Sequence, residues 1–341
     1  MIIISNKSFK DGKKSVSFLG KFFVKETFKG RTKIKIFGHK IFSRTNRNLR
    51  LLNDLKERVD FLTCEQKVRT NSLLRELSAN YLSQTIANQH QKIFPKYKNK
   101  EKGGTAVVVA TGPTLAAYTP IKNAVHIGVN STAKTNIPLK YWFATDIIAI
   151  ETFIDKLVKL KCNKFVGICA NPFSWKESYK ASALNDHPRI IPDSVIEKIH
   201  ANKFYFKTNL REISRNIELE PFYNLCSCVF SAVTFAVYLG VKRIYLVGCD
   251  SANNGYFDDR KQTGDFKADN IVKDWHLFAE SLKLFYPDIE IVSINPVGLR
   301  GLFKDVYTKE YLKANPELRE ELGKNIEILN EKPDKKKTKR K

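Results

Sequence analysis

The feature that most constrains the fold is a series of short apolar runs, separated by helix-forming stretches, between residues 105 and 294. Each run has four to six residues and is bounded by turn-forming residues. Such runs are typical of strands buried on both faces of a parallel sheet, with helices packed on either side. The runs are 106–110, 124–129, 141–145, 164–169, 203–206, 243–248 and 289–294. The sequence therefore predicts an α/β domain over 103–305 with a doubly wound, mainly parallel, Rossmann-like sheet.

The stretches between these runs carry helical patterns. Three of them read "IAIETFIDKLVKL", "LCSCVFSAVTFAVYLG" and "IVKDWHLFAESLKLF", and the second ends with Gly240 as a C-terminal cap. Beyond the domain, residues 306–331 are predicted to form further helices. Residues 332–341, "KPDKKKTKRK", are predicted to be a disordered basic tail.

The first hundred residues follow other patterns. Residues 1–48 form a basic, β-like segment, in which "RTKIKIFG" alternates Lys and Ile before a turn at Gly38, as in a β-hairpin. Residues 49–102 are predicted to be a helical extension and linker, since no Gly or Pro interrupts 49–94. Leu52, Leu55, Val59 and Leu62 have coiled-coil spacing, which Gln66 and Arg69 then interrupt. We interpret this stretch as a helix packed on its own domain or in a homo-oligomer.

The charge is concentrated at the ends of the chain. The net charge is +24, of which residues 1–50 contribute +12 and residues 332–341 contribute +6. A nucleic-acid enzyme spreads basic residues along the face that meets the nucleic acid, so specific nucleic-acid binding is not expected. Basic ends instead suit an anionic surface such as the inner leaflet of a membrane.

The cysteines and apolar segments bear on location. The six cysteines form no CxxC pair, and "CSC" at 226–228 is too tight for a zinc site. No signal peptide and no apolar run of 18 residues is visible in this sequence. We therefore expect a cytoplasmic protein, peripheral to the inner membrane.

Polar residues follow the carboxyl ends of the predicted strands. In parallel sheets, ligands bind beyond these ends. A turn follows the first strand, single polar residues follow the second and third, and longer clusters open one helix and follow the strand 243–248. Helix starts and glycine turns at this edge are suited to phosphate groups. The candidate nucleotide-binding residues are Thr111, Gly112, Pro113, Thr114, Asn130, Asp146, Ser227, Asn253, Asn254 and Tyr256.

Two common phosphate motifs are absent from the sequence. It contains neither GxxxxGK[ST] nor GxGxxG, which argues against P-loop phosphoryl transfer and against a dinucleotide site. Asp258 and Asp259 form an acidic pair, but they lie past the turn that follows the strand. We therefore expect no metal and no cofactor. Arg260 and Lys261 follow the same loop and are candidates to meet a carboxylate or phosphate.

Four stretches resemble a known group of enzymes: "VVVATGPTL", "IGVNST", "SCVFSAVTFAVYLGVKRIYLVGCDSANNG" and "IVSINPVG". They are similar to bacterial sialyltransferases that use CMP-N-acetylneuraminate to cap lipooligosaccharide. The wider group includes the motility accessory factor of flagellin glycosylation and an archaeal-type hydroxymethylpterin pyrophosphokinase. The resemblance covers about 103–300 and implies a GT-A-like sialyltransferase variant of the predicted fold.

The resemblance also implies roles for residues. The turn Thr111–Thr114 corresponds to the turn that contacts the nucleotide phosphate, and Asn130 to the residue that contacts the ribose and phosphate. Asp146 would lie near the cytidine and sugar. Ser227, between Cys226 and Cys228, would contact the donor. Asp250, Asn253 and Asn254 correspond to the acidic loop.

This sequence departs from the family pattern in three places. Ala252 stands near the first of two phosphate-binding tyrosines, and Tyr256 is a candidate for the second. Cys228 replaces a glycine. His276 lies one to two helical turns later than the family's catalytic histidine. A base is needed to deprotonate an acceptor hydroxyl, and His276 and Asp250 are the two candidates. His126, within a strand, is predicted to be a core residue.

The sequence thus predicts a glycosyltransferase of lipopolysaccharide, lipooligosaccharide or capsule biosynthesis. It would transfer an acidic sugar, sialic acid or a Kdo-like sugar, from a CMP-activated donor to a glycan or lipid-linked acceptor. Two alternatives stay open. One is an ATP-dependent pyrophosphokinase of the pterin type, and the other is a non-catalytic basic scaffold.

Overall fold

The computed structural model describes residues 4–8, 14–18, 23–28, 31–36, 39–45, 47–170, 191–207, 213–223, 227–260, 268–323 and 326–329. The chain forms two compact units, Met1–Asn80 and Tyr81–Lys341. The division falls within the long helix α1 (Arg47–Ile93), earlier than the change of pattern that the sequence shows near residue 103. The predicted basic tail, 332–341, lies outside the described residues.

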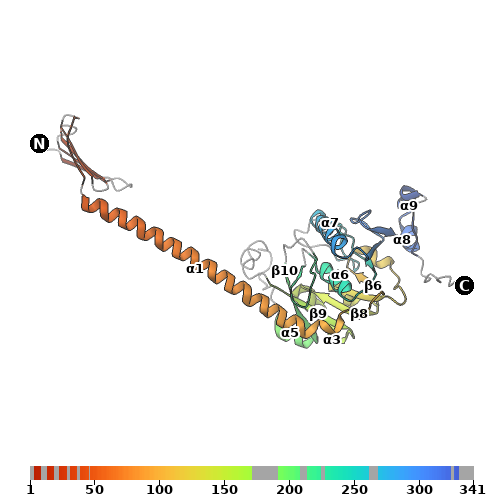
Figure 1. The fold of residues 1–341 in the computed structure, drawn as a ribbon. Coiled ribbons are helices and arrows are strands. Elements are labelled where there is room, and N and C mark those ends of the chain that lie inside the picture. Colours follow the sequence, from red (N-terminus) through yellow and green to blue (C-terminus); the bar gives the residue numbers. More distant parts are fainter. Residues whose placement is uncertain are drawn as a thin grey trace. The chain divides into compact units, whose positions relative to one another are not determined.

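The first unit begins with an antiparallel sheet in which each strand pairs with the next (Figure 1). The hairpin expected around Gly38 is present as its last two strands. Three further strands precede that hairpin, so the sheet is larger than the sequence predicted. The strands are β1 (Ile4–Ser8), β2 (Lys14–Phe18), β3 (Phe23–Phe28), β4 (Arg31–Ile36) and β5 (His39–Thr45).

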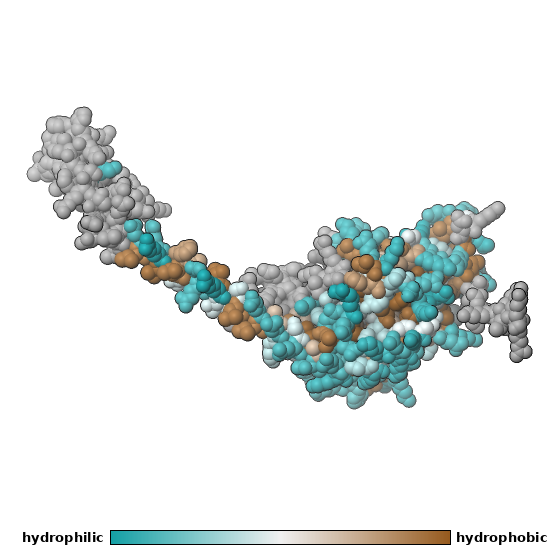
Figure 2. All heavy atoms as spheres, viewed as in Figure 1, coloured by the Kyte–Doolittle hydropathy of each residue, from teal (hydrophilic) through white to brown (hydrophobic). Residues whose placement is uncertain are grey.

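Helix α1 follows the sheet and runs for 47 residues. It is long because no Gly or Pro interrupts it, and it ends before Pro95, which starts the 3-10 turn η1 (Pro95–Tyr97). Figure 2 shows apolar side chains at intervals along this helix. In its last turns, Ile86, His90 and Ile93 are buried and belong to the second unit. None of the helices in the described part of the chain is long and apolar enough to cross a membrane.

The second unit contains a nine-stranded, all-parallel sheet in the order β11-β10-β9-β8-β7-β6-β12-β13-β14. The predicted parallel α/β fold is therefore confirmed. All seven predicted strands are present, and the short β11 and β14 were not predicted. The strands are β6 (Thr105–Val109), β7 (Val125–Val129), β8 (Leu139–Ala144), β9 (Asn163–Cys169), β10 (Ala201–Lys207), β11 (Phe222–Tyr223), β12 (Arg243–Val247), β13 (Glu290–Ile294) and β14 (Lys304–Val306).

Side chains of the sheet alternate between two apolar cores. Ala106 and Val108 face the core that includes α6 and the end of α1, whereas Val107 and Val109 face the core that includes α2 and α3. The stretch predicted as one helix after β8 is divided into α2 and α3 at Phe153. The helices and 3-10 turns are η2 (Pro113–Ala117), η3 (Asn130–Lys134), α2 (Ile147–Thr152), α3 (Ile154–Lys159), α5 (Asp193–Lys198), α6 (Cys228–Tyr238), α7 (Ala268–Phe285), α8 (Lys309–Ala314) and α9 (Pro316–Leu322).

The strand order creates a switch point between β6 and β12. From β6 the chain proceeds through β7 to β11 on one side, then returns to place β12 on the other side of β6. In open parallel sheets, ligands bind at such a point, beyond the carboxyl ends of the two strands. The segments after β6, β7 and β12 are therefore the place to look for a site.

Candidate functional site

The turn after β6 is held against the start of the loop after β12. Ala110 N donates to Val247 O at 2.7 Å, and Gly112 N donates to Gly248 O at 2.8 Å. A Cβ on Gly112 would lie 2.4 Å from Asp250 Cγ and 2.7 Å from Gly248 O. Glycine is therefore required here by close packing. Backbone conformation is not the reason, because a φ of −68° is open to any residue.

Asp250 joins the two segments through its carboxylate. Its Oδ2 accepts hydrogen bonds from Thr114 N at 3.1 Å and from Asn254 Nδ2 at 3.2 Å, and its Oδ1 accepts one from Thr114 Oγ1. Its backbone oxygen accepts from Gly298 N at 2.7 Å. The residue is 3% exposed. Asp250 thus fixes the conformation of the turn that contains Gly112 and Thr114.

Burial shifts the pKa of this carboxyl group. Burial raises the pKa of Asp250 above its ordinary value, although the hydrogen bonds from Thr114 and Asn254 oppose the shift. Tyr311 of α8 lies near enough for its pKa to be raised, first by burial and second by the charge of Asp250. Sequence reasoning missed Tyr311 and Gly298, because no local pattern indicates that the segments after β13 and β14 return to Asp250.

Asn130 directly follows β7, as the first residue of η3, in a backbone conformation that is uncommon for a residue with a side chain. Its φ is +48°, and its backbone oxygen accepts a hydrogen bond from Trp142 Nε1 at 2.8 Å. Its side-chain Oδ1 is buried and has no hydrogen-bond partner among the described residues. A buried acceptor without a donor costs about 1–3 kcal/mol. The side chain is therefore arranged as if for a donor that a ligand would supply.

The register of the sheet brings Asn130 to the turn after β6. Val109 of β6 lies opposite Gly128 of β7, so the two strands end side by side. Two residues beyond each of these positions come Thr111 and Asn130. The structure therefore brings the predicted turn and the predicted amide to one edge of the sheet.

The end of β8 and the start of α6 also meet at this edge. Ser227 is the N-cap of α6, and its Oγ accepts a hydrogen bond from Val229 N at 3.4 Å. Cys228 is buried. Burial raises the pKa of its thiol to about 12, opposed by a hydrogen bond with Thr145 and reinforced by the charge of Asp146. The effect of its charge on the Cys228 thiol shows that Asp146 lies near the start of α6. Cys226 lies outside the described residues.

The loop after β12 folds back over the turn. Phe257 N donates to Thr111 O at 3.0 Å, and Tyr256 lies 4.9 Å from the guanidinium carbon of Arg260. Asn253 and Asn254 are exposed, and Asn254 reaches Asp250 from the solvent side. The predicted loop residues are thus close to the turn, and Asn254 has a defined contact with Asp250.

A charged cluster lies where this loop meets η3. Lys134 Nζ binds Asp258 Oδ2 at 2.7 Å, and Arg260 Nε lies 2.8 Å from both carboxylate oxygens of Asp258. Both cations also lie over the ring of Phe153. Burial acts to raise the pKa of Asp258, but the hydrogen bonds from Lys134 and Arg260 outweigh this effect. The pKa of Asp258 is therefore below its ordinary value.

One nitrogen of this cluster has no acceptor. Arg260 Nη2 is buried without a hydrogen-bond partner in the described structure. A guanidinium nitrogen in that condition is suited to an anionic oxygen from a ligand. Arg260 was recognised in the sequence, whereas Lys134 was not, because a lysine at the end of a short polar turn has no distinctive pattern.

The predicted base His276 belongs to α7 and forms no hydrogen bond or ion pair with these groups within the described part of the chain. It is exposed and is the ninth residue of α7, so it lies about 12 Å along the helix axis from Ala268. His126 is a core residue, as expected. Its ring lies 2.9 Å from Tyr118 Oη, and burial lowers its pKa.

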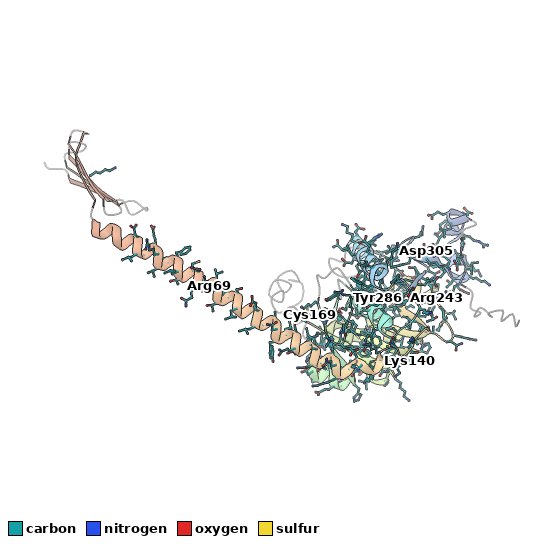
Figure 3. All side chains as sticks on the ribbon, in the orientation of Figure 1. Arg69, Lys140, Cys169, Arg243, Tyr286 and Asp305 are labelled. Atoms are coloured by element: carbon teal, nitrogen blue, oxygen red, sulfur yellow. The ribbon has the colours of Figure 1, made fainter. Side chains whose placement is uncertain are left out.

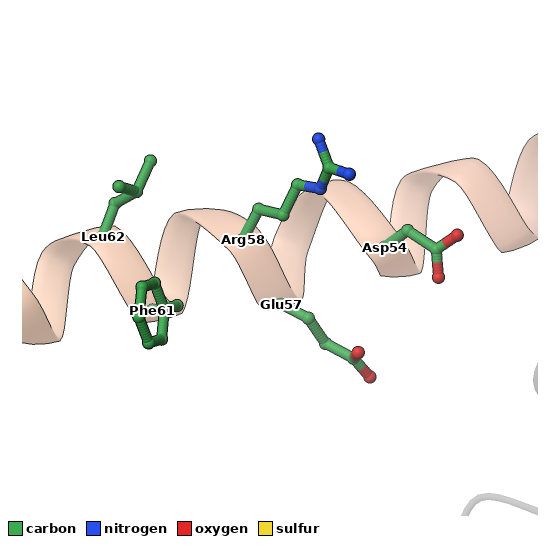
Figure 4. Close-up of a pocket in the computed structure, with 5 residues that line it drawn as sticks. All are labelled: Asp54, Glu57, Arg58, Phe61 and Leu62. Carbon is green, nitrogen blue, oxygen red and sulfur yellow. The ribbon is translucent and has the colours of Figure 1, made fainter.

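Other charged groups lie away from the site. Arg243, labelled in Figure 3, begins β12 at the opposite end of the sheet, where its Nε binds Glu290 Oε2 at 2.6 Å. A shallow hollow on α1 is lined by Asp54, Glu57, Arg58, Phe61 and Leu62 (Figure 4) and belongs to the first unit. Within the described ranges, no group of three or more His, Cys, Asp or Glu side chains is placed to hold a metal ion.

Comparisons with known proteins give distant similarities. No family model matches the sequence, and no curated protein matches it. The structure is similar to the Maf glycosyltransferase from Magnetospirillum magneticum AMB-1, with 11% identity over 66% of this chain and a TM-score of 0.38. This chain spans 38% of the length of that protein.

A second similarity is to the sialyltransferase CstII from Campylobacter jejuni, whose structure was solved with cytidine-5'-monophosphate. The identity is 16%, the match covers 56% of this chain and 80% of CstII, and the TM-score is 0.30. TM-scores of this size establish neither a family nor an activity for this chain.

Proposed function

We propose that this chain is a glycosyltransferase that transfers an acidic sugar from a CMP-activated donor to a glycan acceptor. The observation that carries the proposal is the buried Oδ1 of Asn130, which has no hydrogen-bond partner among the described residues and lies beside the turn after β6, next to the switch point. A ribose hydroxyl or the amino group of a base would supply the missing donor. The sequence resemblance to CMP-sialic-acid-dependent enzymes supports cytidine as the base.

The turn Thr111–Thr114 would hold the phosphate of the donor. Two hydrogen bonds from Thr114 to Asp250 keep this turn in one conformation before any ligand arrives, and Asn254 holds the same carboxylate from the loop after β12. A preorganised polar site stabilises the charge of a departing phosphate without needing to rearrange during the reaction. Thr111, Ser227 and Tyr256 would contribute further polar contacts with the nucleotide.

Arg260 would recognise the negative charge of the donor. Its Nε is occupied by Asp258, while its Nη2 is buried without an acceptor among the described groups. A carboxylate of an acidic sugar or a phosphate oxygen would satisfy it. Lys134, held by Asp258 next to Arg260, would add to the local positive potential.

The transfer itself needs a base for the acceptor hydroxyl. The carboxylate of Asp250 already accepts three hydrogen bonds, which favours a positioning role for this residue. His276 then stays as the proposed base. The proposed reaction is independent of metal, since the carboxylates of Asp250 and Asp258 both accept hydrogen bonds from protein donors.

Turnover of the donor tests this function. The purified chain, in EDTA, is expected to release CMP from CMP-sialic acid or CMP-Kdo, faster with a glycan acceptor present. His276→Gln is expected to reduce CMP release while CMP binding is unchanged. Equal CMP release by the variant would remove His276 as the base, and no release from either donor would contradict the proposed reaction.

A further inference from the structure

Helix α1 carries a row of exposed apolar side chains within the first unit. Its members fall on one helix face in two groups, 55–62 and 73–77, and neighbours within each group are three or four residues apart. They are Leu55, Val59, Leu62, Leu73 and Leu77, each between 56% and 60% exposed. Side chains of this type are rarely left in water as a long contiguous row unless they form a binding surface.

The row follows an eleven-residue repeat instead of a heptad. Continuing the heptad of Leu55 and Leu62 would place Arg69 and Glu76 in the seam. The eleven-residue repeat instead gives seam positions 55, 59, 62, 66, 70, 73 and 77, of which Gln66 and Thr70 are polar. This period, about 3.67 residues per turn, keeps a seam on one face of a nearly straight helix.

The spacing of the seam reads the same in both directions. The intervals are 4, 3, 4, 4, 3 and 4 residues, with Gln66 at the centre. Two copies of the helix in opposite directions would therefore match Leu55 with Leu77, and Val59 with Leu73, of the other copy. Gln66 would face its own copy, and one polar residue at such a place fixes the register.

Charges beside the seam favour this antiparallel arrangement. Arg58, Glu65, Arg69 and Glu76 lie along one flank. In an antiparallel pair this flank meets itself in reverse, so that Arg58 faces Glu76 of the second copy, while the ion pair of Glu65 and Arg69 within one helix meets the same ion pair of the second copy. The two-fold axis makes two attractive pairs of Arg58 with Glu76, against one repulsive pair between the copies of Lys67 on the other flank.

A parallel pair would be less well matched. Arg58 of one copy would then face Lys56 of the other, whereas Lys67 would lie two residues from both Glu65 and Arg69, so that attraction and repulsion balance there. Between residues 54 and 80 the helix has five basic and five acidic residues, so it is neutral. An amphipathic helix that lies on an anionic membrane has a basic polar face instead.

We propose that two copies of this chain associate through an antiparallel pairing of the α1 seam, residues 55–77. Figure 4 shows Leu62 and Arg58 on the same side of the helix, away from Glu57, as this pairing requires. At about 100 Å² for each Leu or Val, five such side chains on two helices would remove roughly 1,000 Å² of apolar surface from water, near the lower bound for a specific interface.

The mass of the full-length chain in solution tests the proposal. Analytical ultracentrifugation is expected to show a dimer, and the double variant Val59→Glu/Leu73→Glu a monomer. Phe61→Glu is the matched control, because Phe61 is 67% exposed but lies off the seam, and this variant is expected to remain dimeric. Circular dichroism would confirm equal helix content. A monomeric wild type, or dimers of all three chains, would overturn the proposal.

A charge exchange tests the orientation. Arg58 and Glu76 are 18 residues apart, about 27 Å along one helix, so they cannot pair within one copy. Arg58→Glu is expected to weaken the dimer about tenfold, and Arg58→Glu/Glu76→Arg to restore it. A stronger dimer with Arg58→Glu alone would indicate the parallel arrangement. Flotation of a monomeric chain with vesicles, lost in Val59→Glu/Leu73→Glu, would assign the seam to a membrane and contradict the proposal.

Discussion

Asn130 shows how one residue can be arranged for a ligand at a cost to the fold. Its φ of +48° is unfavourable for a residue with a Cβ, and its buried Oδ1 has no donor among the described residues. Neither feature stabilises the folded chain. Both become useful if a bound nucleotide donates a hydrogen bond to this oxygen.

Asn130→Gly separates binding from stability. Glycine accepts the positive φ and removes the unpartnered oxygen, so the free energy of unfolding is expected to be unchanged or higher. CMP affinity is expected to fall about tenfold, the equivalent of one hydrogen bond of about 1.4 kcal/mol. Thermal denaturation and calorimetry measure the two effects. Unchanged CMP affinity would show that Asn130 is not part of the site.

Asp250 is expected to give stability a characteristic pH dependence. Because burial raises its folded-state pKa, its contribution is fully present below the unfolded value, about 3.9, and is lost as the pH rises through the folded value. The free energy of unfolding of the wild type, relative to Asp250→Asn, is therefore expected to fall as the pH rises from 4. Urea unfolding between pH 4 and 7 measures this difference. A constant difference would mean that the pKa of Asp250 is not raised.

At the scale of elements, the sequence predicted the parallel strands well and their contacts poorly. The run 106–110 forms β6 because its apolar residues face cores on both sides of the sheet, a pattern visible without a structure. The contact between Gly112 and Asp250 is not visible, since 138 positions separate these residues. Local patterns determine which residues form a strand, whereas the strand order determines which loops meet.

The turn after β6 provides a prediction at this scale. Gly112→Ala would place a methyl group 2.4 Å from Asp250 Cγ, so the turn or the carboxylate must move. The free energy of unfolding is expected to fall by about 1–3 kcal/mol, with CMP binding weakened. Because the φ of Gly112 is −68°, the backbone does not oppose alanine there, so the change measures the cost of the steric contact. If Gly112→Ala bound CMP normally, the turn would not be part of the nucleotide site.

At the scale of the whole molecule, the sequence shows where the charge is concentrated but not how the first unit folds. The concentration of charge at residues 1–50 and 332–341 was evident in the sequence. The five-stranded sheet was not, because only "RTKIKIFG" has a clear strand alternation ended by a turn. That Asn130 Oδ1 is buried without a partner in the described part of the chain could also not be predicted, because its burial depends on packing around β7 and β8.

The basic ends lead to a prediction about membranes. We propose that they attract anionic head groups and bring the site to a lipid-linked acceptor, as expected from about 1 kcal/mol for each basic residue near such a surface. The full-length chain is expected to float with phosphatidylserine vesicles at low salt, less at high salt, and less when residues 332–341 are removed. Equal flotation with neutral and anionic vesicles would refute the electrostatic attraction.

The central claim is that the edge of the sheet between β6 and β12 binds a cytidine nucleotide. Calorimetric titration of the purified chain with CMP, CDP, UDP, GDP and ATP, with and without Mg²⁺, tests it most directly. The account predicts selective binding of CMP that does not depend on Mg²⁺ and is weakened in Asn130→Gly. Magnesium-dependent binding of ATP would instead indicate diphosphate transfer, and the absence of binding by every nucleotide would contradict the claim.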